Sequence, residues 1–349
     1  THANRDHRRR HPAFGFDQWE ISDEPGVYED AYRAWVRRQA PEQLDHLSVG
    51  LPPATAVYYD VMGIEDPVVH PAGGARGDFA GAIAFPGDER YTHTAFVAER
   101  TIDFLGRQTG EQPFLCIAGF YSPHAPWVVP QRYLDLYEPA QFPAADAQQR
   151  AAMHGYYAMI SEVDHHIGRI LQTLDDAGLA EETIVLYTVD HGEWLGDQGR
   201  YGKGYPADDP VSRVPLVVRA PAVVRTQIGR THDALIEAVD VLPTLLDAIG
   251  APVAPELNGQ SFFNLLTGRG YVPRDTALTE FTDWKTLRTR DHRYLIEADG
   301  SESLWAVTAP GNPLDPALAT TQALLAEHRR LLLLRILDAE RPMPRSWPY

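Results

Sequence analysis

The stretch that decides the fold runs from Thr183 to Lys203 and reads TIVLYTVDHGEWLGDQGRYGK. Its first half, up to Val189, is apolar and rich in β-branched side chains, which is typical of a strand buried inside an α/β protein. The strand ends at Asp190 and His191, and a glycine-rich loop leads on to Lys203. Such proteins bind ligands where buried strands end, Asp and His bind metal ions, and a lysine suits an oxyanion. The stretch therefore predicts metal or anion binding; the alternative is a helix cap beside a solvated lysine.

Composition narrows the class of protein. The chain has 349 residues, 44% of them hydrophobic and 23% charged, with a formal net charge of -17. This charge argues against a nucleic-acid partner, and no apolar run approaches the roughly 20 residues of a membrane span. The first residue is Thr1 rather than Met, so the lack of a signal sequence says nothing about localisation, which is left unknown. The single cysteine, Cys116, excludes an internal disulfide, and its apolar surroundings predict a buried, inert thiol.

Helical and strand-like segments alternate along the first part of the chain. We expect helices over 28–39, 92–107, 151–177 and 233–249, and buried strands over 113–120, 183–189 and 214–218. This alternation predicts the α/β class, with a mostly parallel sheet sandwiched by helices. Residues 41–86 are rich in Pro, Gly and Ala and predict a long surface insertion.

The character of the sequence changes after about residue 251. Short strand-like runs follow at close spacing, and Asp299-Gly300 predicts a hairpin turn between the last two. A helix is expected after them, over 317–338. We therefore predict an α/β catalytic domain of residues 1–250 and a C-terminal subdomain of residues 251–349 with a small antiparallel sheet. The strands of that sheet are expected over 276–281, 286–289, 294–297 and 303–307.

A second polar motif follows the strand predicted over 113–120. There the loop YSPHAPW, residues 121–127, contains two prolines that stiffen it and place His124 just past the strand end. If the strands share one parallel sheet, His124, Asp190 and His191 face one crevice, with Lys203 on the adjoining loop. Together these side chains would bind a divalent cation and a tetrahedral oxyanion. Taken singly, His124 also fits a structural histidine and Lys203 a surface lysine.

Five segments resemble, in order, the sulfatases of the alkaline-phosphatase-like superfamily. PFLCIAGFYSPHAPWVVPQRYLDLY (113–137) is similar to the family's strand and S/D-P-H-x-P loop. YYAMISEVDHHIGRILQTLDDAGLAEETIVLYTVDHGEWLGDQGRYGKG (156–204) is similar to its helix, D-H/N-G site and G-K lysine. VSRVPLVVRAP, EAVDVLPTLLDAIG and NGQSFFNLLTG follow. The resemblance covers about 14–300 and implies the family's fold without its N-terminal part, and sulfuric ester hydrolysis.

The resemblance also implies roles for individual residues. Asp190 and His191 would be ligands of a divalent cation, usually calcium in this family, with Mn²⁺ or Mg²⁺ as alternatives. His124 and Lys203 would bind the sulfate group, and one of them would assist the leaving group. Thr1-His2 looks like the end of the family's G-K-x-H motif, which would place His2 against the nucleophile; alternatively, His2 is only a terminal residue. Arg213 also matches a family position, where a structural role is expected.

The family's nucleophile is a formylglycine hydrate made from the Cys or Ser of a C/S-x-P-x-R motif, and this motif does not occur in the 349 residues. Cys116 does not qualify, because Ile117 and Ala118 follow it. The family's paired N-terminal aspartates are missing as well. We therefore expect the nucleophile to lie outside this chain and the chain alone to be inactive. The expected protein partner is a missing N-terminal segment or a further copy of the chain in a homo-oligomer.

Other functions remain open. A phosphonate monoester or phosphodiester hydrolase of the same superfamily is the nearest alternative, and a remnant that binds a sulfated ligand without cleaving it is another. The expected substrate is an anionic sulfate ester of a sugar or an aryl alcohol. Trp127, Trp194 and Tyr205 would offer it an aromatic platform, unless they serve only for packing.

Overall fold

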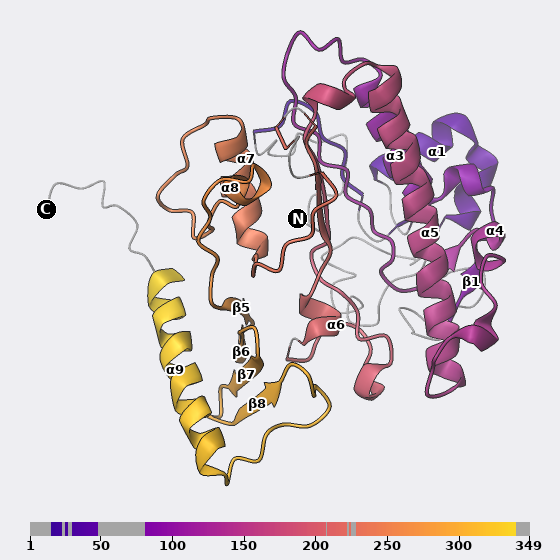
Figure 1. Ribbon diagram of the computed structural model, residues 1–349. Coiled ribbons are helices and arrows are strands. Elements are labelled where there is room, and N and C mark those ends of the chain that lie inside the picture. Colours follow the sequence, from indigo (N-terminus) through magenta and orange to yellow (C-terminus); the bar gives the residue numbers. More distant parts are fainter. Residues whose placement is uncertain are drawn as a thin grey trace, which may run out of the picture. The chain divides into compact units, whose positions relative to one another are not determined.

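A computed structural model describes residues 15–22, 25–26, 30–47, 81–206, 208–221, 223–224 and 228–339. The chain forms two compact units, residues 1–180 with 198–201 and residues 181–197 with 202–349, which are considered separately (Figure 1). The predicted domains, 1–250 and 251–349, stay a prediction. Most of the predicted insertion over 41–86 lies outside the described residues, as does His2.

Capped helices form most of the first unit. The first residues of α1, α3 and α5 follow Asp30, Thr92 and Asp146, whose side-chain oxygens each accept a hydrogen bond from a backbone N–H of the first turn. The predicted helices over 28–39, 92–107 and 151–177 are thereby confirmed to within a few residues. The elements are α1 (Ala31–Gln39), η1 (Pro41–His46), β1 (Ile83–Ala84), η3 (Glu89–Tyr91), α3 (His93–Leu105), β2 (Val128–Val129), α4 (Gln131–Leu134), η4 (Pro139–Gln141), α5 (Ala147–Asp176) and, where the units meet in sequence, η5 (Ala180–Glu182).

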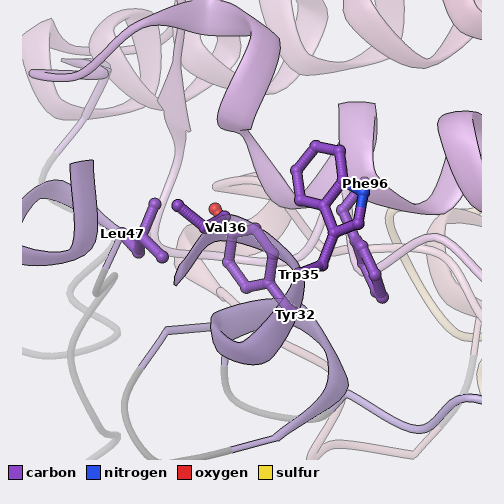
Figure 2. Packing of buried hydrophobic residues seen from close by; sticks show 5 residues of the cluster. All are labelled: Tyr32, Trp35, Val36, Leu47 and Phe96. Carbon is purple, nitrogen blue, oxygen red and sulfur yellow. The ribbon is translucent and has the colours of Figure 1, made fainter. Parts of the chain in front are cut away.

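The core of the first unit is aromatic. Helix α3 packs along α5 and against α1 (Figure 1). Tyr32, Trp35 and Val36 of α1 meet Phe96 of α3 and Leu47, and all five side chains are almost completely buried (Figure 2). Strands β1 and β2 pair in parallel, as expected for the α/β class.

The prediction of a buried strand over residues 113–120 is wrong. These residues are not part of any strand, and Leu115 and Ile117 are 64% and 70% exposed. Exposure alternates along the segment, so one row of side chains packs inward and the other faces outward. The continuous apolar run had predicted a strand with both faces covered. In the described part of the chain, however, no strand pairs with residues 113–120.

In the second unit, β3 (Val185–Thr188) pairs with β4 (Leu216–Arg219), so strands are present within two of the three predicted ranges. The predicted burial is wrong, because Tyr187 and Val217 are 37% and 60% exposed. The pair is antiparallel, however, with Tyr187 opposite Val217. A parallel connection needs a helix long enough to cross the sheet. Among the described residues between the two strands, the helical elements are the short η6 (Asp197–Gly199) and α6 (Asp209–Ser212), which is why the parallel expectation fails here.

The segment after β4 leads to η7 (Ala238–Asp240), α7 (Val241–Ala248) and α8 (Phe263–Leu266). The helix predicted over 233–249 starts later than expected, because Glu237 and Asp240 form a capping box at its beginning. One face of the β3–β4 pair packs toward α7 and α8 around a small apolar cavity, lined among others by Leu186, Val218, Leu245 and Phe262.

The C-terminal antiparallel sheet is confirmed. Strands β5 (Ala277–Glu280), β6 (Trp284–Arg288), β7 (His292–Glu297) and β8 (Glu302–Ala306) pair in sequence order. The predicted turn is present: Gly300 has φ +86° and its N–H donates to the Glu297 carbonyl. Helix α9 (Ala319–Ala339) covers the sheet, with Leu287, Tyr294, Leu304, Leu325 and Leu332 between them. No helix in the described part of the chain is both long and apolar enough to cross a membrane.

Candidate functional site

The turn after β3 brings Asp190, His191 and Lys203 together, all within the second unit. The Asp190 carboxylate accepts a hydrogen bond from the His191 backbone N–H at 3.0 Å, and its other oxygen lies 3.4 Å from His191 Nε2. The Asp190 side chain is 86% exposed, whereas that of His191 is largely covered. Three of the predicted site residues therefore lie in direct contact at the end of the strand.

His191 orients the lysine. Its Nδ1 lies 2.7 Å from the Gly192 carbonyl oxygen, and its Nε2 lies 2.7 Å from Lys203 Nζ. Because a carbonyl can only accept and an ammonium can only donate, both contacts require the neutral imidazole that carries its proton on Nδ1. The lysine then donates one of its three N–H groups to His191 and points the other two elsewhere.

Gly192 allows the turn to approach the backbone of α6 closely. Its N–H donates to the Val211 carbonyl at 2.7 Å, and the next N–H, of Glu193, donates to Pro210 at 3.1 Å. A Cβ atom at position 192 would lie 2.0 Å from the Pro210 carbonyl oxygen. Only glycine fits at such a distance, so the contact fixes the position of Asp190 and His191.

Glu193 closes the loop between His191 and Lys203. Its Oε1 accepts from the backbone N–H groups of Leu195, at 3.1 Å, and of Gly202. The Trp194 N–H donates to the Gly202 carbonyl, which brings the two ends of the loop together. The role of Glu193 was not predicted from the sequence. It could have been inferred from the position of a carboxylate within a glycine-rich loop, where exposed backbone N–H groups need an acceptor.

His124 lies in the first unit, at the end of a tight turn. Its N–H donates to the Tyr121 carbonyl at 3.0 Å, and its ring Nδ1 lies 2.6 Å from the Ala125 carbonyl oxygen. The Tyr121 hydroxyl donates to that same carbonyl at 2.9 Å. Nδ1 must therefore carry a proton, which leaves Nε2 as the nitrogen that exchanges protons. That His124 shares a crevice with Asp190, His191 and Lys203 stays a prediction.

The described residues alone do not make a complete cation site. No group of three or more His, Cys, Asp or Glu side chains among them is arranged to hold a metal ion. Asp190 and His191 supply two donors, whereas calcium takes 6–8 oxygen ligands. The Nε2 atom of His191 is also in contact with Lys203.

The remaining predicted residues have mainly structural contacts. Trp127 and Trp194 are completely buried, so they serve packing, whereas Tyr205 is 44% exposed and lies edge-on to Trp194. Cys116 is half-buried rather than deeply buried, and burial raises the pKa of its thiol, which agrees with an inert group. Arg213 is exposed, and its N–H closes the end of α6 by donating to the Asp209 carbonyl.

Comparison with known proteins gives consistent matches. A family model described as Sulfatase matches residues 9–251. An arylsulfatase of Clostridium perfringens is 29% identical over 215 residues, which are 54% of this chain and 44% of the relative. An N-acetylglucosamine-6-O-sulfatase of Bacteroides thetaiotaomicron is 35% identical over 123 residues, 35% of this chain and 22% of the relative.

Among solved structures, a phosphonate monoester hydrolase of Agrobacterium radiobacter superposes with a TM-score of 0.73. The superposition covers 89% of this chain and 70% of that one, at 24% sequence identity, and indicates a shared fold. The chain spans less than half the length of the curated relatives it matches.

Proposed function

The chain belongs to the sulfatase family, and from that premise we propose that it forms part of an enzyme that hydrolyses sulfate esters. The observation that carries this proposal is the contact of 2.7 Å between Lys203 Nζ and His191 Nε2, directly after the strand end at Asp190. It fixes an ammonium group at the strand end, and a fixed cation is what the transfer of a negatively charged sulfuryl group requires.

We assign Lys203 to the sulfate oxygens. Its ammonium has three donors, and the neutral His191 ring accepts one of them. Two donors can then serve an oxyanion without moving the lysine. In this arrangement His191 holds the lysine in place, so the pair acts as one anion-binding unit.

We assign His124 to the leaving group. The Ala125 carbonyl holds one proton on Nδ1, so the imidazolium form gives its second proton, from Nε2, to the departing alkoxide or phenoxide and becomes the neutral Nδ1–H tautomer. Tyr121 fixes the same carbonyl through its hydroxyl, and this keeps the imidazole from rotating.

The formylglycine nucleophile is proposed to lie outside these 349 residues, which do not contain C/S-x-P-x-R. A divalent cation, calcium first of all, would stabilise the charge of the transferred group when bound. Asp190 and His191 would supply two of its ligands only if further oxygen ligands completed the site and Lys203 moved off the imidazole.

Titration calorimetry with inorganic sulfate tests the role of Lys203. We expect Lys203→Met to weaken sulfate binding about tenfold or more, the effect of losing a charged hydrogen-bond donor. Lys285→Met is the matched control, because Lys285 is paired with Glu280 on the C-terminal sheet. Equal affinity of Lys203→Met and the unchanged chain would refute the assignment.

One observation favours a phosphonate monoester hydrolase as a second candidate. His191 places an imidazole next to the carboxylate of Asp190, and imidazole suits transition metals better than calcium. Titration of the chain with Mn²⁺ and Ca²⁺ distinguishes the sulfatase from the phosphonate monoester hydrolase. Tighter binding of Mn²⁺ that is lost in His191→Asn supports the phosphonate enzyme; a preference for Ca²⁺ that is lost in Asp190→Asn supports the sulfatase.

The substrate class is proposed to be a sulfated sugar or an aryl sulfate. The relatives named above are an arylsulfatase and a sulfatase of N-acetylglucosamine 6-O-sulfate. The exposed ring of Tyr205, edge-on to Trp194, offers an aromatic surface close in sequence to Lys203. Calorimetry with a sulfated sugar and an aryl sulfate would rank them, and binding without cleavage by a completed enzyme would indicate a ligand-binding remnant instead.

A further inference from the structure

Hydrogen bonds tie a buried carboxyl group to the first turn of α3, and that turn to the loop of His124. Glu162, in the middle of α5, accepts a hydrogen bond at 2.7 Å from the hydroxyl of Thr92, which caps α3 by accepting from the Ala95 N–H at 3.1 Å. Thr94 Oγ1 in turn lies 3.0 Å from Ser122 Oγ. Ser122 stands two residues before His124, inside the same tight turn. All of these residues belong to the first unit.

Burying the carboxyl group of Glu162 at this place costs free energy of desolvation. It is 1% exposed, and burial raises the pKa of its carboxyl group to about 7. Thr92 and Thr94 are buried as well. A leucine of similar size would fill the same space without the desolvation cost of a carboxyl group. The roles proposed above for Lys203, His191 and His124 make no use of this carboxyl.

The first turn of α3 holds the His124 loop at a second point. The His93 ring lies edge-on to the Tyr121 ring, with centroids 6.3 Å apart. Tyr121 donates to the Ala125 carbonyl, the same oxygen that His124 Nδ1 contacts. The loop is therefore held through Ser122 on one side and through Tyr121 on the other.

We propose that Glu162 is a positioning residue for His124, acting through Thr94 and Ser122. The link to catalysis rests on the proposed function, in which His124 serves the leaving group. Glu162 holds the Thr92 hydroxyl and, with it, the first turn of α3, in which Thr94 pairs with Ser122. Glu162 thereby fixes the positions of Thr94 and Ser122 and, with them, the turn that keeps the His124 proton on Nδ1.

The direct readout is the tautomer of His124, measured by NMR on the full chain with ¹⁵N-labelled histidine. The His124 signals are identified by their loss in His124→Asn. In the unchanged chain we expect the proton on Nδ1. In Thr94→Val, Ser122→Ala and Glu162→Leu we expect the ratio of the two neutral tautomers to change about two- to tenfold, the effect of one lost hydrogen bond.

Thr101→Val is the matched control. Thr101 is a second buried threonine of α3, and its hydroxyl donates within the helix to the Val97 carbonyl. This variant loses a buried hydroxyl of the same kind but should leave the His124 tautomers unchanged. Because Glu162 is proposed to act through Thr94, the double variant Thr94→Val with Glu162→Leu should change the ratio no more than either single variant.

Unchanged His124 signals in all three variants would overturn the proposal, as would an equal change in Thr101→Val. The readout needs no substrate, so it stands apart from the proposed function. If the tautomer responds but sulfate binding is absent, the positioning role holds and the assignment of the site fails.

Discussion

Lys203 is one of only two lysines in the chain, among 31 Lys and Arg residues together. Most ion pairs in the described part of the chain are made by arginine, for instance Arg274 with Glu237 and Arg293 with Asp208. An arginine binds anions through a flat fork, whereas the compact ammonium of lysine can share its three donors between His191 and an oxyanion. The residue type at this position therefore agrees with the proposed role.

Gly192 offers a test of the turn that carries Asp190 and His191. A Cβ at this position would lie 2.0 Å from the Pro210 oxygen, so Gly192→Ala must displace the backbone. We expect the unfolding free energy to fall by about 3 kcal/mol, as for severe overpacking, and sulfate binding to weaken. Gly204→Ala is the control, because nothing lies within 4 Å of its Cβ. Equal stability of the two variants in urea would contradict this reading.

The buried carboxyl of Glu162 predicts a dependence of stability on pH. Its pKa is raised to about 7 from 4.5, so the folded chain keeps a proton that the unfolded chain releases near pH 4.5. The resulting stabilisation is fully present below pH 4.5 and is lost as the pH rises through 7. Glu162→Gln cannot ionise, and between pH 4.5 and about pH 8 its stability relative to the unchanged chain should rise by about 3 kcal/mol.

Urea denaturation of both proteins across this range measures the difference directly. Burial lowers the pKa values of His93 and His166 to about 4. Their contribution to the unfolding free energy therefore falls as the pH falls, but it does so equally in both proteins. Parallel pH profiles of the two proteins would show that Glu162 does not titrate near neutrality.

Contacts close in sequence could be predicted, and contacts between distant segments could not. Asp190, His191 and Lys203 are joined by one short loop, so their spacing alone indicated a cluster. Glu162 was missed because a single glutamate within a helix pattern normally faces solvent, and its burial depends on α3, about 70 residues earlier. The relation of His124 to the cluster depends on how two separate units meet, which local patterns do not encode.

At the scale of elements, the same distinction holds. Helices with a clear 3.6-residue period and hairpins with Asp-Gly turns were predicted closely, because caps and turns are local. Strand pairing was not: β3 and β4 run antiparallel, and residues 113–120 remain unpaired in the described part of the chain. An apolar run indicates burial but does not say which strand lies beside it.

A buried ion network joins α9 to the segment before α7. Glu237 is hydrogen-bonded by Arg274 at 2.8 Å and by Arg335 of α9 at 2.8 Å, and all three side chains are mostly buried. Glu237→Gln would remove the buried carboxylate that both guanidinium groups contact and leave Arg274 with Asp240 and Arg335 with Asp338. We therefore expect a loss of about 3 kcal/mol in unfolding free energy.

Glu327→Gln is the control for this network, since Glu327 forms an exposed pair with Arg330 one turn away on α9. Its stability in urea should equal that of the unchanged chain within error. If Glu237→Gln were equally harmless, α9 would be held by its apolar contacts alone.

At the scale of the whole molecule, we expect the chain to bind sulfate without cleaving a sulfate ester. The 349 residues contain the candidate oxyanion residues but no C/S-x-P-x-R motif. We therefore expect the chain alone to release no product from 4-nitrophenyl sulfate above the background of Lys203→Met. Turnover that disappears in Lys203→Met would show instead that the chain contains a nucleophile of its own.

The most direct measurement of the central claim, that Lys203 contacts the sulfate group, is protection from an amine-reactive reagent. With only two lysines in the sequence, peptide mass spectrometry follows Lys203 and Lys285 in the same sample. The account predicts that inorganic sulfate slows the acylation of Lys203 and leaves that of Lys285 unchanged. Equal rates at Lys203 with and without sulfate, or equal slowing at both lysines, would contradict it.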